Sequence, residues 1–163
     1  MVLHLSSNKE EGETHAVNFT KASGDWINRN WHKLIPEIMQ LVLEAEGVEP
    51  SHRVLNDMLS GFVLGALNLW LFIEGDEMKG FLVTSYGLGG PAGNSACYVR
   101  QLRMFETMPP EEMAKALETL KEECFKRGCT HIIAVTNNPA VAKIAENYGA
   151  YIDTRMIWSV HNG

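Results

Sequence analysis

One stretch near the C-terminal end, residues 130–150, restricts the possible folds more than any other part of the chain. It begins with residues 131–135, a β-branched and apolar run that is typical of a strand buried on both faces. An Asn-Asn-Pro turn follows, and Pro139 fits the first turn of a helix. The next apolar residues recur at helical spacing: Val141, Ile144, Ala145 and Tyr148. Gly149 can end this helix in the left-handed conformation, so the stretch predicts one strand–helix unit of an α/β domain.

A helix over residues 109–127 has the clearest amphipathic pattern in the chain. Its apolar face carries Met113, Leu117, Leu120 and Cys124. On the outer face are three pairs of a glutamate and a cation, and in each pair the glutamate comes four residues before the cation. Acidic residues therefore come before basic ones along the helix, as the helix dipole favours. A strand at residues 96–106 precedes this helix and another at residues 130–136 follows it. Together they predict a βαβ unit with two parallel strands.

An antiparallel hairpin precedes the βαβ unit. Residues 68–73 and 78–86 have strand patterns, and the turn between them contains Gly75-Asp76. The glycine-rich residues 87–95 are interpreted as a hairpin loop, because neither a Lys-Ser/Thr pair nor a helix follows, as a phosphate-binding loop requires. In the next strand, Arg100 and Arg103 are three residues apart, so strict alternation places them on opposite faces.

Two helices come before the hairpin. An apolar stripe over residues 26–46 predicts the first, in which Pro36 is expected to cause a kink or to separate two consecutive helices. The second is expected after Ser51, which suits the N-cap position. With a last strand at residues 151–160, the order of elements predicts an α/β fold (α+β mixed). In this fold, helices cover both faces of a mixed central sheet.

The length and charge of the chain restrict its organisation and its partners. For 163 residues we expect a single domain over residues 26–163, after a mobile segment 1–25 with a possible edge strand at residues 16–20. The net charge of −6 disfavours nucleic acid and anionic membranes, and it argues against a DNA-reading function of the first two helices. No apolar run reaches membrane-spanning length and residues 1–22 lack a signal-peptide core, so a cytoplasmic protein is expected.

The cysteines and histidines have no spacing that is typical of a ligand set. Cys97, Cys124 and Cys129 include no C-x-x-C pair, so they are expected to be reduced thiols. The six histidines are scattered along the chain, and no metal site is expected.

The order of elements resembles that of the GNAT family, the acyl-CoA-dependent N-acyltransferases, over residues 26–160. Residues 138–150 look like the family's late helix, with its N-x-x-A and Y-x-x-x-G-F pattern. Residues 129–132 after Gly128 look like the family's approach to its fifth strand. The resemblance implies an enzyme that uses acetyl-CoA or another acyl-CoA to acylate a small-molecule or peptide amine. Small GNAT-like chains are common in bacteria and their phages, so the resemblance is also compatible with a phage protein.

The same resemblance implies where the coenzyme would lie. Backbone groups of the strand before the amphipathic helix, at Leu102 and Met104, would bind the pantetheine arm. Backbone N–H groups at the start of that helix, with Met113 among them, would hold the pyrophosphate, as helix N-termini do for anions. Asn137 and Asn138 lie where the family contacts the coenzyme arm, although helix capping explains them equally well.

Two residues are candidates for proton transfer on the same basis. In the family a carboxylate, or a water that it holds, deprotonates the amine, and Glu106 at the end of the strand is the candidate. A tyrosine on the late helix protonates the leaving thiolate, and Tyr148 is the candidate. Each also has an ordinary structural interpretation: Glu106 as a solvated strand end, and Tyr148 as part of an apolar helix face.

Two departures from the family pattern leave catalysis open. The family's pyrophosphate loop has the pattern R/Q-x-x-G-x-G/A, whereas residues 106–113 read ETMPPEEM. Pro109 and Pro110 have no N–H to donate, and a carboxylate about 4 Å from a phosphate costs on the order of 4 kcal/mol at an effective dielectric of about 20. The family's tyrosine lies four residues before the glycine, where this chain has Ala145. Tyr148 lies almost one helical turn further along.

The alternative function is therefore a catalytically inactive GNAT-fold protein that acts as a structural or protein-binding module. Such a protein would act with a protein partner or as a homo-oligomer. The changed pyrophosphate loop favours this alternative, whereas the usual activity of the family favours an enzyme, and the sequence leaves both open.

Overall fold

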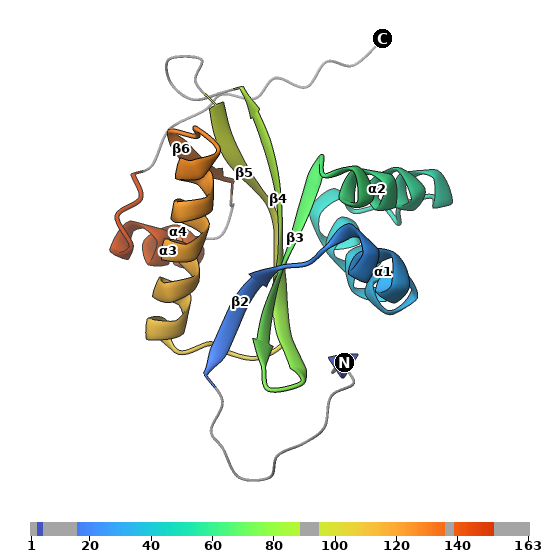
Figure 1. Ribbon diagram of the computed structural model, residues 1–163, viewed down its shortest axis with the longest axis horizontal. Coiled ribbons are helices and arrows are strands. Elements are labelled where there is room, and N and C mark those ends of the chain that lie inside the picture. Colours follow the sequence, from blue (N-terminus) through green and yellow to red (C-terminus); the bar gives the residue numbers. More distant parts are fainter. Residues whose placement is uncertain (1–2, 5–15, 89–94, 136–138, 152–163) are drawn as a thin grey trace.

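A mixed β-sheet lies between two layers of helices (Figure 1). The computed structural model describes residues 3–4, 16–88, 95–135 and 139–151. On one face of the sheet lie α1 (Gly24–Glu46) and α2 (His52–Leu64), and on the other lie α3 (Pro110–Lys126) and α4 (Pro139–Asn147). This arrangement confirms the predicted mixed sheet with helices on both faces. None of these described helices has an apolar stretch long enough to cross a membrane.

Five strands follow one another across the sheet. In spatial order they are β2 (Val17–Lys21), β3 (Leu67–Glu74), β4 (Glu77–Leu88), β5 (Ser95–Met104) and β6 (His131–Ala134). A short sixth strand, β1 (Leu3–His4), pairs with the start of β4. Neighbours from β2 to β5 are antiparallel, whereas β5 and β6 are parallel, as the predicted βαβ unit requires. β2 corresponds to the predicted edge strand and pairs with β3.

A tight turn joins β3 to β4. Glu74 pairs with Glu77, and only Gly75 and Asp76 lie between them. Gly75 has a φ of 63°, a left-handed conformation that glycine adopts at the first position of such a turn without steric cost. The Gly75-Asp76 pair therefore produces the hairpin that the sequence predicts.

The helices α1 and α2 bury their apolar sides against one face of the sheet. The side chains of Ser23 and Ser51 accept the N–H groups of Trp26 and Val54, at 3.1 and 3.3 Å, and so cap the two helices. The most deeply buried residues of this layer are Ile27, Leu34, Ile38, Leu69, Met78, Phe81 and Val83. Pro36 lies inside α1, which continues through it as one helix. The alternative of two consecutive helices is wrong. The turns before and after Pro36 both bury apolar side chains in the core, and this packing keeps the segment one helix.

The helix α3 covers the other face of the sheet. Its buried residues pack against β3, β4 and β5, and this second core contains Trp70, Phe72, Leu82, Cys97, Ala116, Leu120 and Cys124. At the end of α4, Gly149 has a φ of 89°, and the N–H groups of Gly149 and Ala150 donate to Glu146 and Ala145 at 2.9 and 3.1 Å. These two bonds form the helix end that a left-handed glycine allows. Ala145 is itself exposed, so its predicted place on a buried face is wrong.

The strand β6 is less buried than its apolar sequence predicts. His131, Ile132 and Ile133 are half-buried and Ala134 is exposed, so the expectation of a strand buried on both faces is wrong. The reason is its place in the sheet: among the described strands β6 pairs only with β5.

Several predicted features lie outside the described residues. They are most of the mobile segment 1–25, the centre of the loop 87–95 and the last strand beyond residue 151. The domain boundary at residue 25 remains a prediction.

Candidate functional site

The parallel strands β5 and β6 separate part of the way along their length. Their pairing begins with Ala96 and His131 and ends with Val99 and Ala134. Beyond this point, residues 101–104 of β5 pair with β4, and residues 100–104 pair with no other described strand. The backbone groups on this edge can therefore pair with an extended ligand, as the free edge of a sheet does with a peptide.

A β-bulge lies at the point of separation. Val83 of β4 pairs with Gln101, whereas the next residue, Thr84, pairs with Val99. Arg100 is therefore an extra residue without an opposite partner on β4. A bulge of this kind bends its strand and increases the local twist. It accounts for the departure of β5 from β6 at the same residue.

The bulge also brings Arg100 and Arg103 to the same face of the sheet. Arg100 donates from Nε to Ser85 Oγ at 2.7 Å, and Ser85 pairs with Leu67, which packs against the α1/α2 core. Arg103 donates from Nε to Glu37 of α1 at 3.3 Å. The predicted placement on opposite faces is wrong, because the extra residue shifts the alternation of the strand.

Leu102 and Met104 lie on the separated part of β5 and face the α3/α4 layer. Leu102 pairs with Leu82, a core residue beneath α3, and Met104 packs against the same core. Leu102 remains 45% exposed. Both residues lie where the resemblance expects the pantetheine arm, and their contact with it stays a prediction.

The start of α3 offers few free backbone donors. Pro109 and Pro110 have no N–H, and the N–H groups of Glu112 and Met113 donate to the Pro109 carbonyl at 3.1 and 3.2 Å. Glu112 Oε1 accepts from Lys115 at 3.3 Å, while its Oε2 is buried without a hydrogen-bond partner within the described chain. The N–H of Met113, expected to hold the pyrophosphate, is therefore used inside the helix, and a carboxylate lies beside it.

Tyr148 reaches the start of α3 from the end of α4. Its hydroxyl donates to the Pro110 carbonyl at 3.1 Å, and its ring is half-buried. The candidate acid thus lies next to the expected position of the pyrophosphate. Its catalytic role stays a prediction. Asn137 and Asn138, the other candidates near α4, lie outside the described residues.

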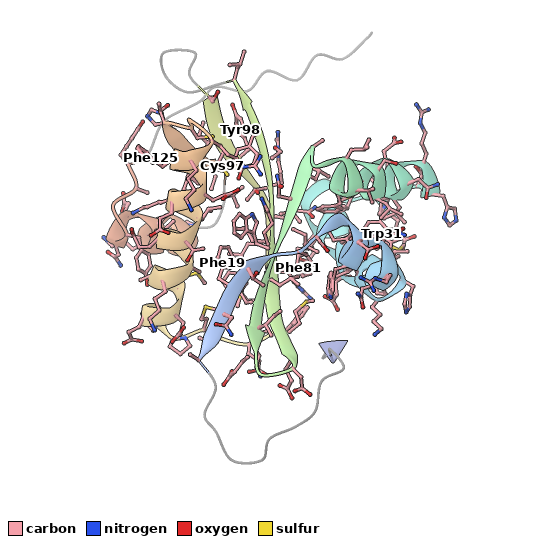
Figure 2. All side chains as sticks on the ribbon, in the orientation of Figure 1. Phe19, Trp31, Phe81, Cys97, Tyr98 and Phe125 are labelled. Carbon is pink, nitrogen blue, oxygen red and sulfur yellow. The ribbon has the colours of Figure 1, made fainter. Side chains whose placement is uncertain are left out.

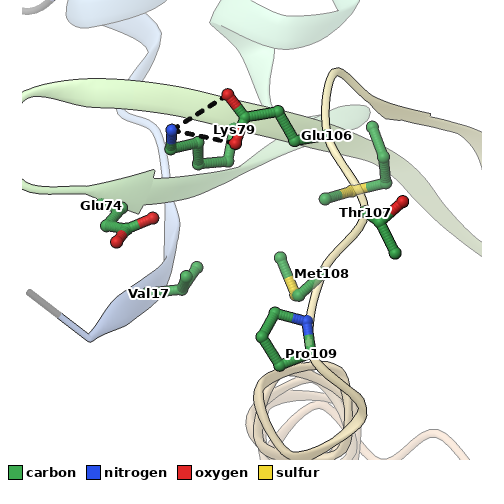
Figure 3. A pocket seen from close by; sticks show the side chains of 8 residues that line it. Val17, Glu74, Lys79, Glu106, Thr107, Met108 and Pro109 are labelled. Atoms are coloured by element: carbon green, nitrogen blue, oxygen red, sulfur yellow. Dashed lines mark hydrogen bonds and ion pairs between the residues drawn. The ribbon is translucent and has the colours of Figure 1, made fainter.

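Glu106 lies two residues beyond β5 and pairs with Lys79 of β4. Lys79 Nζ is 3.2 and 3.1 Å from the two carboxylate oxygens of Glu106 and 2.9 Å from Glu77. These hydrogen bonds, with Glu77 first, raise the pKa of Lys79. Figure 3 shows the pair at a small pocket that is also lined by Val17, Glu74, Met104, Thr107, Met108 and Pro109. Glu106 therefore points to the β4 side of β5, whereas the separated edge lies on the β6 side. Its role as base stays a prediction.

The α1/α2 face of the separated strand carries polar groups that the sequence analysis did not assign to a site. Arg103 contacts two carboxylates of α1, Glu37 at 3.3 Å and Glu44 at 3.7 Å. Gln101 pairs with Val83 and so faces the same side, and its buried Oε1 has no hydrogen-bond partner among the described residues. No local pattern could reveal these contacts, because Arg103 and Glu37 are 66 positions apart.

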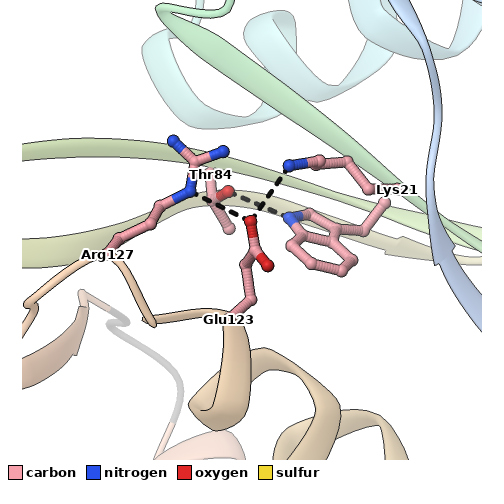
Figure 4. Close-up of polar contacts among 5 residues, drawn as sticks. Lys21, Thr84, Glu123 and Arg127 are labelled. Atoms are coloured by element: carbon pink, nitrogen blue, oxygen red, sulfur yellow. Dashed lines mark hydrogen bonds and ion pairs between the residues drawn. The ribbon is translucent and has the colours of Figure 1, made fainter. Parts of the chain in front are cut away.

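A polar network connects the far end of α3 to the edge of the sheet (Figure 4). Glu123 Oε1 accepts from Lys21 of β2 and from Arg127, each at 3.0 Å. Beneath it, Trp70 Nε1 donates to Thr84 Oγ1 at 3.1 Å. The hydrogen bonds from Arg127 and Lys21 lower the pKa of Glu123. These groups satisfy one another, so we assign the network a structural role.

The three cysteines are free thiols near this network. Cys97 and Cys124 are buried, and Cys129 is partly buried. A hydrogen bond with Cys124, together with burial, raises the pKa of Cys97. In the parts of the chain that the structure describes, no three His, Cys, Asp or Glu side chains are arranged to hold a metal ion.

Comparisons with known proteins give matches in structure alone: no family model and no curated protein matches the sequence. A probable acetyltransferase has a TM-score of 0.68 and 10% identity, over 90% of this chain and 98% of that one. A predicted acetyltransferase with acetyl-CoA from Clostridium acetobutylicum has a TM-score of 0.63 and 19% identity, over 89% and 96%. An aminoglycoside acetyltransferase from an uncultured soil metagenomic sample, in complex with sisomicin, has a TM-score of 0.66 and 7% identity, over 90% and 95%.

These similarities cover nearly all of each chain, and they agree with the order of elements observed here. At such low identities they establish the fold and leave the activity to be tested. The chain has the fold of the GNAT-type acetyltransferases.

Proposed function

We propose that the chain is a GNAT-like N-acyltransferase that transfers an acyl group from acetyl-CoA or another acyl-CoA to an amine. The separation of β5 from β6 carries this proposal, because residues 100–104 have no strand partner on the β6 side within the described sheet. The amides of a pantetheine arm suit such an edge, since an extended chain joins a strand through backbone hydrogen bonds. A structure of the same fold with acetyl-CoA supports the proposal.

The reaction requires two proton transfers. An acyl-CoA supplies an acyl group that is activated as a thioester. The amine nitrogen attacks the carbonyl carbon, the C–N bond forms, the C–S bond breaks, the amine loses a proton and the thiolate gains one. Tyr148 is the proposed donor to the thiolate on the basis of the resemblance. Its hydroxyl bonds to the Pro110 carbonyl at the phosphate end of the expected site, so the side chain must release that carbonyl and move along the pantetheine arm to reach the sulfur. Glu106 is the proposed base on the same basis. Lys79 occupies both of its carboxylate oxygens and the side chain points away from the separated edge, so a proton from the amine reaches it only through a chain of waters.

The start of α3 favours a second function, a GNAT-fold protein without catalysis that serves as a structural or protein-binding module. The Met113 N–H is bonded to Pro109, and the partner-less carboxylate oxygen of Glu112 belongs to the first turn of α3, where the resemblance expects the pyrophosphate. Repulsion on the order of 4 kcal/mol between a carboxylate and a phosphate about 4 Å apart would remove about half of the roughly 8 kcal/mol of a micromolar affinity. Such a protein would bind a protein partner or a second copy of itself.

Calorimetric titration of acetyl-CoA into the purified chain tests the first function. We expect a dissociation constant in the micromolar range. Leu102→Glu places a charge on the separated strand and should abolish binding. Leu64→Glu, at the 83% exposed end of α2, is the matched control and should bind like the wild type. Equal binding by both variants would contradict the proposed position of the pantetheine arm.

A Glu111→Gly/Glu112→Gly variant distinguishes the two functions. If the wild type does not bind acetyl-CoA and this variant does, the acidic start of α3 blocks the site. If neither binds while circular dichroism shows both folded, the acyltransferase proposal fails and the binding module remains.

A further inference from the structure

The α1/α2 face of the bulge is the side from which an acceptor would reach the thioester. In the proposed function the coenzyme lies toward α3 and α4, where Pro110 and Tyr148 flank the expected position of its phosphates. An amine must then approach the separated strand from the opposite face of the sheet. Arg100, Gln101 and Arg103 are the β5 residues of the separated segment that face this side.

The two arginines on this face differ in their charge balance. Arg103 lies 3.3 Å from Glu37 and 3.7 Å from Glu44, so its charge is compensated. Arg100 has no ion pair with any residue that the structure describes, and its Nε donates to the neutral hydroxyl of Ser85 at 2.7 Å. Arg100 is therefore the uncompensated cation next to the point of separation.

The side chain of Arg100 is also held in a fixed position. Besides its bond to Ser85, the guanidinium lies over the ring of Tyr98, 4.9 Å from the ring centroid, and the Tyr98 hydroxyl donates to the Leu88 carbonyl at 3.0 Å. The terminal nitrogens of Arg100 make no hydrogen bond within the described residues. A planar guanidinium with its terminal N–H groups free is suited to a two-point contact with a carboxylate.

Gln101 provides the complementary group for the amine. Its Oε1 is buried and has no donor in the described structure. A buried acceptor without a donor is unfavourable. The oxygen and nitrogen ends of the amide are nearly equal in shape, so the group can turn over and present Oε1 to the N–H of a bound amine. Because Gln101 follows Arg100 directly in the bulge, the amine and carboxylate of one small molecule could reach both residues.

We propose that the acceptor of this chain is an amino acid, whose carboxylate binds Arg100 and whose amine lies at Gln101. This inference rests on the proposed acyltransferase function and adds the class of acceptor to it. The transfer forms a C–N bond at the amine and breaks the C–S bond of the acyl-CoA, and the carboxylate takes no part. Polyamines should be poor acceptors, because Arg100 repels their additional positive charges.

The test compares acceptors that differ only in the carboxylate. The full chain is incubated with acetyl-CoA and with each common amino acid, the corresponding amino-acid amide, or spermidine, and the acetylated product is measured by mass spectrometry. We expect kcat/KM for the preferred amino acid to exceed that for its amide and for spermidine by about 10- to 100-fold, as the loss of a charged hydrogen bond implies.

An Arg100→Gln variant tests the residue itself. We expect it to raise KM for that amino acid about 10- to 100-fold, with little change in the dissociation constant of acetyl-CoA, and Arg100→Lys to restore part of the loss. Arg53→Gln, which removes a 90% exposed arginine of α2, is the matched control. Titration of the amino acid into the CoA-saturated proteins should show the same order: the wild type binds most tightly, then Arg100→Lys, then Arg100→Gln. Acetyl-CoA binding by Arg100→Gln confirms that this variant is folded.

Four results would overturn the inference. If acetyl-CoA binds and amides or spermidine react as fast as amino acids, the acceptor class is wrong and the acyltransferase function stands. If acetyl-CoA binds and no amino acid is acetylated, the acceptor class is wrong. If Arg100→Gln leaves KM unchanged, Arg100 is not the carboxylate site. If the wild type does not bind acetyl-CoA, the proposed function fails, and this inference fails with it.

Discussion

Gly80 is a position in β4 where a side chain has no room. It pairs with Met104 at the end of β5. A Cβ atom at Gly80 would clash with the carbonyl oxygen of Arg103 and lie 2.6 Å from Met104 Sδ. The close approach of the two backbones therefore depends on glycine, and it sets the place where β5 leads into the connection to α3.

Replacing Gly80 should destabilise the protein through this contact. We expect Gly80→Ala to lower the free energy of unfolding by about 2–3 kcal/mol, the usual cost of forcing an atom into a packed site. Gly87→Ala in the same strand is the control, because its Cβ would meet only the Tyr98 ring, at 3.6 Å. It should cost less than about 1 kcal/mol. Equal urea midpoints for the two variants would show that the strands can move apart.

The helix α3 is attached to the end of α4 at its start and to the sheet at its end. At its start the Tyr148 hydroxyl bonds to Pro110, and at its end Glu123 joins Lys21 of β2 to Arg127. The second attachment depends on charge. Arg127 and Lys21 hold the pKa of Glu123 below its ordinary value of 4.5, so the folded state favours the carboxylate. This stabilisation is present above pH 4.5 and is lost as the pH falls through the lowered pKa.

A Glu123→Gln variant measures this attachment. At pH 7 we expect the free energy of unfolding to fall by about 1 kcal/mol, the usual contribution of a partly exposed charged hydrogen bond. The difference from the wild type should shrink as the pH falls below 4.5 and through the lowered pKa of Glu123. Urea unfolding at pH 7, 5 and 3 provides the measurement. Glu118→Gln on the exposed side of α3 should change little at any pH, and a difference for Glu123→Gln that is as large at pH 3 as at pH 7 would disprove the linkage.

The whole molecule is built from two apolar cores on opposite faces of one sheet. One contains Ile38 of α1, and the other contains Leu120 of α3. Because the sheet separates them, residues of one core do not belong to the other. The losses of stability caused by substitutions in the two cores should therefore be independent of each other.

A double substitution tests this independence. Ile38→Val should cost about 0.5–1.5 kcal/mol and Leu120→Ala about 2–5 kcal/mol, as loss of buried methyl groups does. We expect the double variant to show their sum within about 0.5 kcal/mol in urea unfolding. Leu34→Ala with Ile38→Val, two changes in the same core, is the comparison in which additivity should fail. A large coupling between Ile38 and Leu120 would mean that the sheet transmits strain between the layers.

The sequence alone was sufficient for features that depend on neighbouring residues. The amphipathic pattern of α3, the Gly75-Asp76 turn and the Ser51 cap of α2 all follow from local chemistry, and the structure confirms them. The order of these elements was enough to predict the mixed sheet and the resemblance to the GNAT fold. Local preferences act over a few residues, so a pattern in the sequence records them directly.

Only the tertiary structure decided how the candidate site is arranged. The bulge at Arg100 arises from pairing with β4 and cannot be read from β5 itself. Glu106 is paired with Lys79, 27 positions away, and Arg103 with Glu37, 66 positions away. Side chains alternate between the two faces of a strand only while each residue has one partner on the neighbouring strand. An ion pair depends on which helices and strands meet in space. Both conditions are set by the packing of the whole chain.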